Sequence, residues 1–184
     1  MLRLAALLTC HNRRRQTIEC LAALLGCVRP DEMKLDVFVV DDGSTDGTAA
    51  AIRTRFTDVQ VMQGDGNLYW AGGMRLAFAE ALKRDYDFYL FLNDDTVLES
   101  DALMRLLATH EEVGGRSKRV GAIIGTTRDP ETRLPTYGGA TACQLLALYE
   151  AGASHAYRTR DRVRQHEHQL CSCAPGGGAS RRDL

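Results

Sequence analysis

The chain has 184 residues, 45% of them hydrophobic, and a formal net charge of −1. This length suffices for one domain with a sizeable core, and the near-neutral charge argues against nucleic acid as a partner. No apolar run reaches the ~20 residues that span a bilayer. The N-terminal apolar run is too short for a signal peptide, so we expect a cytoplasmic protein. The basic run at residues 13–15 is interpreted as a solvated helix start.

Six cysteines occur along the chain. Without an export signal, we expect no disulfide framework. Cys20 and Cys27 are seven residues apart, on one face of a predicted helix. They are therefore predicted to be small buried residues.

Short apolar runs predict five strands, at residues 4–8, 37–40, 59–62, 88–92 and 120–124. Segments with helical periodicity lie between or after them, at residues 18–25, 49–56, 74–82 and 103–107. Asp46 and Ser100 are the predicted caps of the second and fourth helices. This alternation predicts an α/β fold with a mostly parallel sheet and helices on both faces.

Large apolar residues become scarce after residue 150, where arginines and glycines dominate. We therefore predict one domain over residues 1–150 and an irregular C-terminal tail over residues 151–184. His166, His168, Cys171 and Cys173 are close enough in sequence to suggest zinc, but their spacing matches no familiar zinc pattern. A tail without fixed packing is the favoured interpretation.

Polar turns follow the first four predicted strands. They contain Thr9, His11 and Asn12, then DDGS at residues 41–44, GDGN at 64–67 and NDD at 93–95. In a parallel sheet these turns share the carboxyl edge, where ligands bind. Turns favour Asp, Asn, Gly and Ser in any protein, but this preference explains the paired carboxylates poorly.

Two adjacent acids, Asp94 and Asp95, repel each other unless a cation compensates. Oxygen ligands favour Mg²⁺ or Mn²⁺, with positions left open for substrate phosphates. The alternative is that one of the two acids caps the next helix. Trp70, in the segment GDGNLYWAGG, either packs on a sugar ring or fills the core.

Four motifs resemble family 2 glycosyltransferases of the GT-A fold: LLTCHNRRRQT, VFVVDDGSTDGT, GDGNLYWAGGMRLAF and FLNDDTVL. The resemblance covers about residues 3–140. It implies a Rossmann-like half that binds a nucleoside-diphosphate sugar and a divalent metal, Mg²⁺ or Mn²⁺.

The same resemblance implies roles for individual residues. Thr9 and Asp42 would contact the donor base, Asp41 would support the turn or the ribose, and Asp94 would face the ribose or diphosphate. Asp95 would be the best metal ligand, with Asp94 as the second. The remaining donor-site residues would be Asn12, Asn67, Gly72 and Gly73.

Two departures from the family pattern stand out. Arg75 replaces an Asn that often follows the glycine pair, and nothing after residue 140 resembles the acceptor half that carries the catalytic base. The base is therefore unassigned, and we expect a chain that lacks this half to transfer little sugar.

The implied function is inverting transfer of a sugar to a hydroxyl of a glycan or lipid-linked acceptor. It would serve cell-surface polysaccharide or glycoconjugate synthesis, in the cytoplasm or by peripheral association at the inner face of the membrane. The alternative is a non-catalytic nucleotide-binding remnant. A sugar-1-phosphate nucleotidyltransferase would need a glycine-rich N-terminal loop, and a receiver domain would need acids where Thr9 and His11 stand.

Overall fold

A computed structural model describes residues 1–116 and 122–137 of the chain. The chain divides into a compact unit of Met1–Ile123 and a second unit that begins at Ile124. Strands and helices alternate along the first unit: β1 (Leu2–Cys10), α1 (Arg14–Leu25), β2 (Met33–Asp41), α2 (Thr48–Arg55), β3 (Gln60–Gln63), α3 (Tyr69–Ala81), β4 (Phe88–Phe91) and α4 (Ala102–Arg116). No helix of the described residues is long and apolar enough to cross a lipid bilayer.

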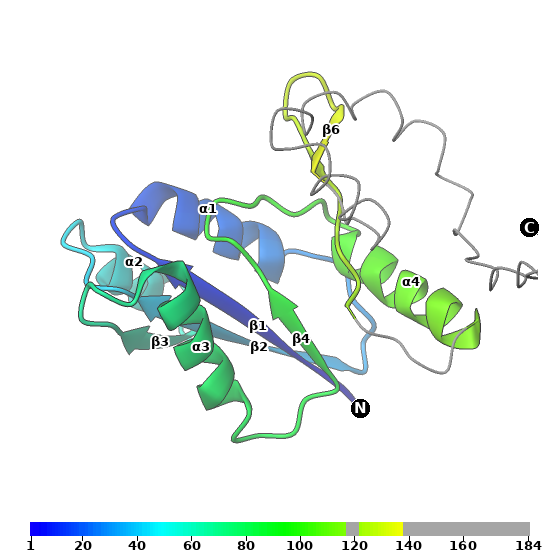
Figure 1. Ribbon diagram of the computed structural model, residues 1–184, viewed down its shortest axis with the longest axis horizontal. Coiled ribbons are helices and arrows are strands. Elements are labelled where there is room, and N and C mark those ends of the chain that lie inside the picture. The colour runs from blue at the N-terminus through cyan, green and yellow to red at the C-terminus, as the bar shows by residue number, and fades with distance from the viewer. Residues whose placement is uncertain (117–121, 138–184) are drawn as a thin grey trace, which may run out of the picture. The chain divides into compact units, whose positions relative to one another are not determined.

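The four strands form one parallel sheet in the order β3-β2-β1-β4 (Figure 1). Along the β1–β2 pair, Leu2 lies beside Met33 and Cys10 lies beside Asp41. Strand β1 is therefore central, with β2 on one side and β4 on the other. The predicted parallel α/β sheet is confirmed, and this strand order places the turns after β1, β2 and β4 next to one another.

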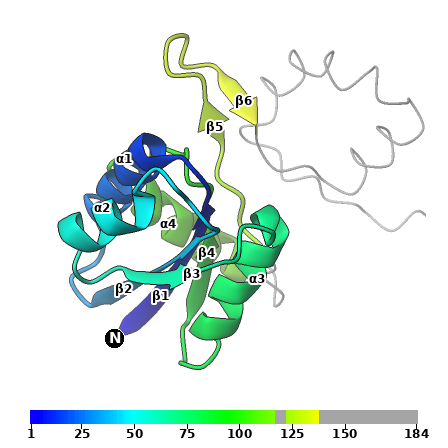
Figure 2. The ribbon, with the colours of Figure 1, turned by 90° about the vertical axis from the view of Figure 1, so that its left-hand side faces the viewer.

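Each face of the sheet has its own core. The residues of β1 alternate between the two cores, because successive side chains of a strand point to opposite faces of the sheet. Leu4, Ala6 and Leu8 belong to a core that includes residues of α1, α2 and α4, whereas Ala5 and Leu7 pack with α3. Figure 2 shows α3 on one side of the sheet and α1 and α2 on the other. The apolar run of β1 is continuous because both of its faces are buried.

Two helices begin at the same carboxylate. Asp46 accepts a hydrogen bond from the backbone N–H of Thr48 and another from the backbone N–H of Arg14, each at 3.0 Å. The N-cap position of α2 is Gly47, which makes no side-chain cap hydrogen bond, so Asp46 supports the starts of α2 and α1 from outside the predicted cap position. Helix α4 begins at Ala102, so Asp101 precedes it directly and the prediction of Ser100 as its cap is wrong.

Two further predictions concern the C-terminal side of the chain. Residues 122–124 of the predicted fifth strand are not in a strand, and the start of that run lies outside the described residues. An apolar run becomes a strand only where a neighbour takes up its backbone hydrogen bonds. In the second unit, the short strands β5 (Thr127–Arg128) and β6 (Pro135–Tyr137) pair antiparallel. The predicted tail at 151–184, with its His and Cys cluster, lies outside the described residues, so the domain boundary at residue 150 stays a prediction.

Candidate active site

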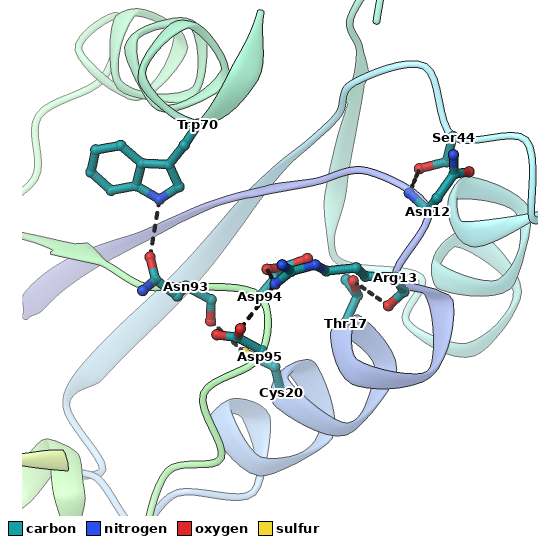
Figure 3. Close-up of polar contacts among 9 residues, drawn as sticks. All are labelled: Asn12, Arg13, Thr17, Cys20, Ser44, Trp70, Asn93, Asp94 and Asp95. Atoms are coloured by element: carbon teal, nitrogen blue, oxygen red, sulfur yellow. Dashed lines mark hydrogen bonds and ion pairs between the residues drawn. The ribbon is translucent and has the colours of Figure 1, made fainter. Parts of the chain in front are cut away.

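The turns after β1 and β2 are joined by side-chain hydrogen bonds. The backbone N–H of Asn12 donates to Ser44 Oγ at 2.9 Å (Figure 3), and Asn12 Oδ1 accepts from the backbone N–H of Thr45 at 2.8 Å. Asn12 has a positive φ of 51°, a conformation that Asn tolerates better than most residues. The His11 ring bonds to the carbonyl oxygen of Asp42. These contacts hold the two turns in one fixed arrangement.

The two acids that follow β2 are both buried and both engaged with backbone. Asp41 is 1% exposed, and its Oδ1 accepts from the N–H of Ser44 at 3.0 Å. Asp42 is 4% exposed, and its two oxygens accept from the N–H groups of Gly66, at 2.8 Å, and Tyr69, at 2.9 Å. Asp42 thus fixes the loop between β3 and α3 to the end of β2.

Glycines allow this loop and helix α3 to approach the sheet closely. A Cβ added at Gly73 would overlap the side chain of Thr9, and one added at Gly64 would overlap the carboxylate of Asp42. Gly66 has a φ of +88°, which favours glycine. Helix α3 therefore rests directly on the carboxyl end of β1.

The guanidinium group of Arg13 bridges the two acids that follow β4. Arg13 Nη1 lies 2.9 Å from Asp95 Oδ2 and 3.3 Å from Asp94 Oδ1 (Figure 3). The other oxygen of Asp94, Oδ2, is buried and has no hydrogen-bond partner among the described residues. Burial raises the pKa of Asp94, against the lowering effect of Arg13, and Asp95 raises it further. Asp94 Oδ2 is therefore a buried acceptor whose hydrogen-bonding capacity the described residues leave unsatisfied.

The side chain of Trp70 is tied to the same strand end. Its indole Nε1 donates to Asn93 Oδ1 at 3.0 Å, while Asn93 lies directly before the acid pair (Figure 3). Trp70 is 56% exposed, so the interpretation that it fills the core is wrong. Helix α4 starts only at Ala102, so capping of that helix by Asp94 or Asp95 is also wrong.

The family assignment follows from a comparison of the whole chain with family models. The model described as "Glycosyl transferase family 2" matches residues 6–167. The chain belongs to glycosyl transferase family 2. The match extends past residue 140, where the resemblance of the motifs ends. A comparison with curated proteins gave no match.

Solved structures show the same fold for this family 2 chain. Staphylococcus aureus TarS 1–349 in complex with UDP has a TM-score of 0.52 and 22% identity over 60% of this chain and 32% of that chain. Its complex with UDP-GlcNAc gives the same values. The mannosyltransferase PcManGT from Pyrobaculum calidifontis, in complex with GDP-Man and Mn²⁺, has a TM-score of 0.57 and 21% identity over 70% of this chain and 36% of that chain. The fold is therefore of the GT-A type, and the chain spans about a third of the length of these structures.

The predicted site residues of the family 2 chain fall into three groups. Most lie at the carboxyl ends of β1, β2 and β4, which this topology brings together: Thr9, Asn12, Asp41, Asp42, Asp94 and Asp95. Gly72 and Gly73 are buried, and Gly73 lies against Thr9. Asn67 and Arg75 are exposed. The roles of all these residues in donor binding stay predictions.

Sequence reasoning missed the part played by Arg13. The run at residues 13–15 is predicted to be solvated, yet Arg13 bonds to both acids of the β4 turn. The contact depends on the strand order, which only the three-dimensional structure reveals. A central β1 flanked by β4 places the residues after β1 opposite the residues after β4, so an arginine there meets the acid pair.

Proposed function

We propose that this chain binds a nucleoside-diphosphate sugar and belongs to an inverting glycosyltransferase. The acceptor would be a hydroxyl of a glycan or lipid-linked molecule in cell-surface polysaccharide or glycoconjugate synthesis, used in the cytoplasm or at the inner face of the membrane. The observation that carries the proposal is the meeting of three polar turns at one sheet edge, with a buried oxygen on Asp94 that has no hydrogen-bond partner in the described part of the chain. Ligands of open parallel sheets bind at such an edge.

The chemistry of the acid pair fits a divalent cation, Mg²⁺ or Mn²⁺. Asp94 offers Oδ2, which has no hydrogen-bond partner among the described residues, and Asp95 has a half-exposed carboxylate. Two carboxylates with open positions suit such a metal, because substrate phosphates and water complete its coordination. When bound, the ion neutralises charge that develops on the leaving diphosphate. PcManGT, which has the same fold, was solved in complex with GDP-Man and Mn²⁺.

The nucleoside would lie on the side of β1 and β2. Thr9, Asp41 and Asp42 come together there, and Asn12 joins the two turns. Asp42 holds the loop that contains Asn67, so this loop has a defined position before any ligand arrives. A preorganised loop loses less conformational freedom on binding and so supports higher affinity.

Calorimetric titration tests the proposal directly. We expect UDP, GDP or dTDP to bind more tightly with Mn²⁺ than without it, and Asp95→Asn to abolish this difference. Asp65→Asn, an exposed acid in the loop after β3, is the matched control and should keep the difference. Equal affinity with and without Mn²⁺ in the unmodified chain would refute the metal role, and absence of nucleotide binding would refute the proposal as a whole.

A further inference from the structure

Two adjacent aromatic side chains stand exposed at the start of α3. Tyr69 is 78% exposed and Trp70 is 56% exposed. Exposing a large aromatic side chain leaves apolar area in water, whereas burying it would stabilise the fold. An exposed aromatic ring that is also held in place by polar contacts is therefore a candidate for ligand binding.

The two residues are held by different turns. The backbone N–H of Tyr69 donates to Asp42 Oδ2, after β2, and Tyr69 takes a positive φ of 53°. The indole of Trp70 donates to Asn93 Oδ1, after β4. The backbone oxygen of Asn93 in turn accepts from the buried Cys20 thiol at 3.4 Å. Trp70 is thus anchored to a turn that is itself bonded to the core.

The indole has one hydrogen-bond donor, and Asn93 already uses it. The aromatic surface is what remains for a ligand. Asn93 immediately precedes Asp94 and Asp95, the pair proposed to hold the metal and diphosphate. The group bonded to the terminal phosphate of a nucleotide sugar is a sugar ring, whose C–H faces are apolar enough to cover an aromatic ring.

We infer that Trp70 is a specificity-determining residue, whose indole contacts the sugar ring of the donor rather than its nucleotide. This inference rests on the proposed donor-binding function. Asn93 is the positioning residue, because its amide oxygen orients the indole (Figure 3). Trp70 should therefore contribute to the affinity for a nucleotide sugar but not to the affinity for the nucleoside diphosphate that it contains.

The experiment compares each nucleoside diphosphate with its sugar conjugate, in Mn²⁺, by calorimetry: UDP with UDP-GlcNAc and UDP-glucose, GDP with GDP-mannose, and dTDP with dTDP-glucose. We expect at least one conjugate to bind about tenfold more tightly than its diphosphate, the gain for covering an aromatic face. Trp70→Ala should remove this gain and leave diphosphate affinity within about twofold, and Trp70→Phe should keep part of it. Tyr69→Ala, the adjacent exposed aromatic, is the control that should retain the gain.

Fluorescence gives an independent readout, because Trp70 is the single tryptophan of the chain. Its emission should change with the tighter-binding conjugate beyond any change caused by the diphosphate. A gain that survives in Trp70→Ala, or conjugates that never exceed their diphosphates in the unmodified chain, would overturn the inference while leaving nucleotide binding intact. Absence of binding by every diphosphate would instead overturn the proposed function, and this inference with it.

Discussion

The guanidinium of Arg13 lies 2.9 Å from the carboxylate of Asp95, although the two residues are 82 positions apart in the chain. The same nitrogen reaches Asp94 at 3.3 Å. One positive charge therefore offsets two adjacent negative charges, one of them on a buried side chain. A divalent cation that binds this acid pair must share the carboxylates with Arg13 or displace it.

Replacing Arg13 should change both the stability of the chain and its response to Mn²⁺. Arg13→Gln removes the positive charge, so the metal-free variant should lose about 1–2 kcal/mol of stability, because Asp94 and Asp95 then repel each other without compensation. Mn²⁺ should raise the melting temperature of Arg13→Gln more than that of the unmodified chain. Thermal unfolding with and without Mn²⁺ measures both changes.

The matched control for this prediction is Arg15→Gln, two residues along the same helix start. Arg15 pairs with Glu19 at the surface, where its side chain is 86% exposed. Its loss should cost less than about 1 kcal/mol and leave the response to Mn²⁺ unchanged. Equal shifts for the two variants would show that Arg13 has no special relation to the acid pair.

Asp42→Asn should weaken nucleotide binding whether or not metal is present. The carboxylate accepts two backbone N–H groups, and an amide retains only one acceptor oxygen. Losing one charged, buried hydrogen bond costs about 1.5–3 kcal/mol, which should loosen the loop after β3 and lower affinity about tenfold. Calorimetry on folded protein checks this, with Asp65→Asn as the exposed control in the same loop. Unchanged affinity in a folded Asp42→Asn variant would reject the role of this loop in binding.

Gly73→Ala should destabilise the fold through a contact with Thr9. The new methyl group would lie within 2.7 Å of Thr9 Cβ, so α3 or β1 must move. Overpacking of this kind costs about 1–3 kcal/mol. Adding Thr9→Ala should recover part of the loss, and urea unfolding of both single variants and the double variant measures the coupling. Gly125→Ala, whose added Cβ meets no described residue within 4 Å, should be nearly neutral. Additive effects of Gly73→Ala and Thr9→Ala would contradict the proposed clash.

Two buried thiols should make stability fall at high pH. Burial is the main cause and a nearby acid, Asp41 for Cys10 and Asp94 for Cys20, adds to it; together they raise the pKa of each thiol to about 12. The unfolded chain releases these protons near pH 9, so the folded chain binds more protons between about pH 9 and pH 12. Stability should then fall by up to about 1.4 kcal/mol per pH unit for each thiol.

Urea unfolding at pH 8, 9.5 and 10.5 measures this dependence, and the difference between the unmodified chain and Cys20→Ala isolates one thiol from other titrating groups. Alkylation followed by peptide mapping gives a second test. Cys10 and Cys20 should react only after unfolding, because the thiolate is the reactive form. Rapid alkylation of either cysteine in the folded chain at pH 8 would contradict the raised pKa values.

The alternation of apolar runs and helical periods determined the fold class and the first four strands. These signals are local, since a strand buried on both faces must be apolar along its length, as residues 4–8 are. The involvement of Asp46 in the start of α2 was also evident from the sequence, because its carboxylate bonds the N–H of Thr48, only two positions away. Residues 122–124 of the fifth apolar run are not in a strand, because strand formation depends on a distant neighbour as well as on the local pattern. Strand formation there requires a partner strand, and an apolar pattern says nothing about whether one exists.

The candidate site also has features that the sequence predicted and features that only the tertiary structure showed. The acids at the strand ends could be found from the sequence, because parallel strands bring their carboxyl ends to one edge. Only the tertiary structure showed which contacts the side chains make there. It placed Arg13 on the acid pair, Thr9 under Gly73 and the Trp70 indole on Asn93. Each of these contacts joins residues far apart in the chain. Their geometry depends on strand order and on the closeness of helix packing, which no local pattern of residues encodes.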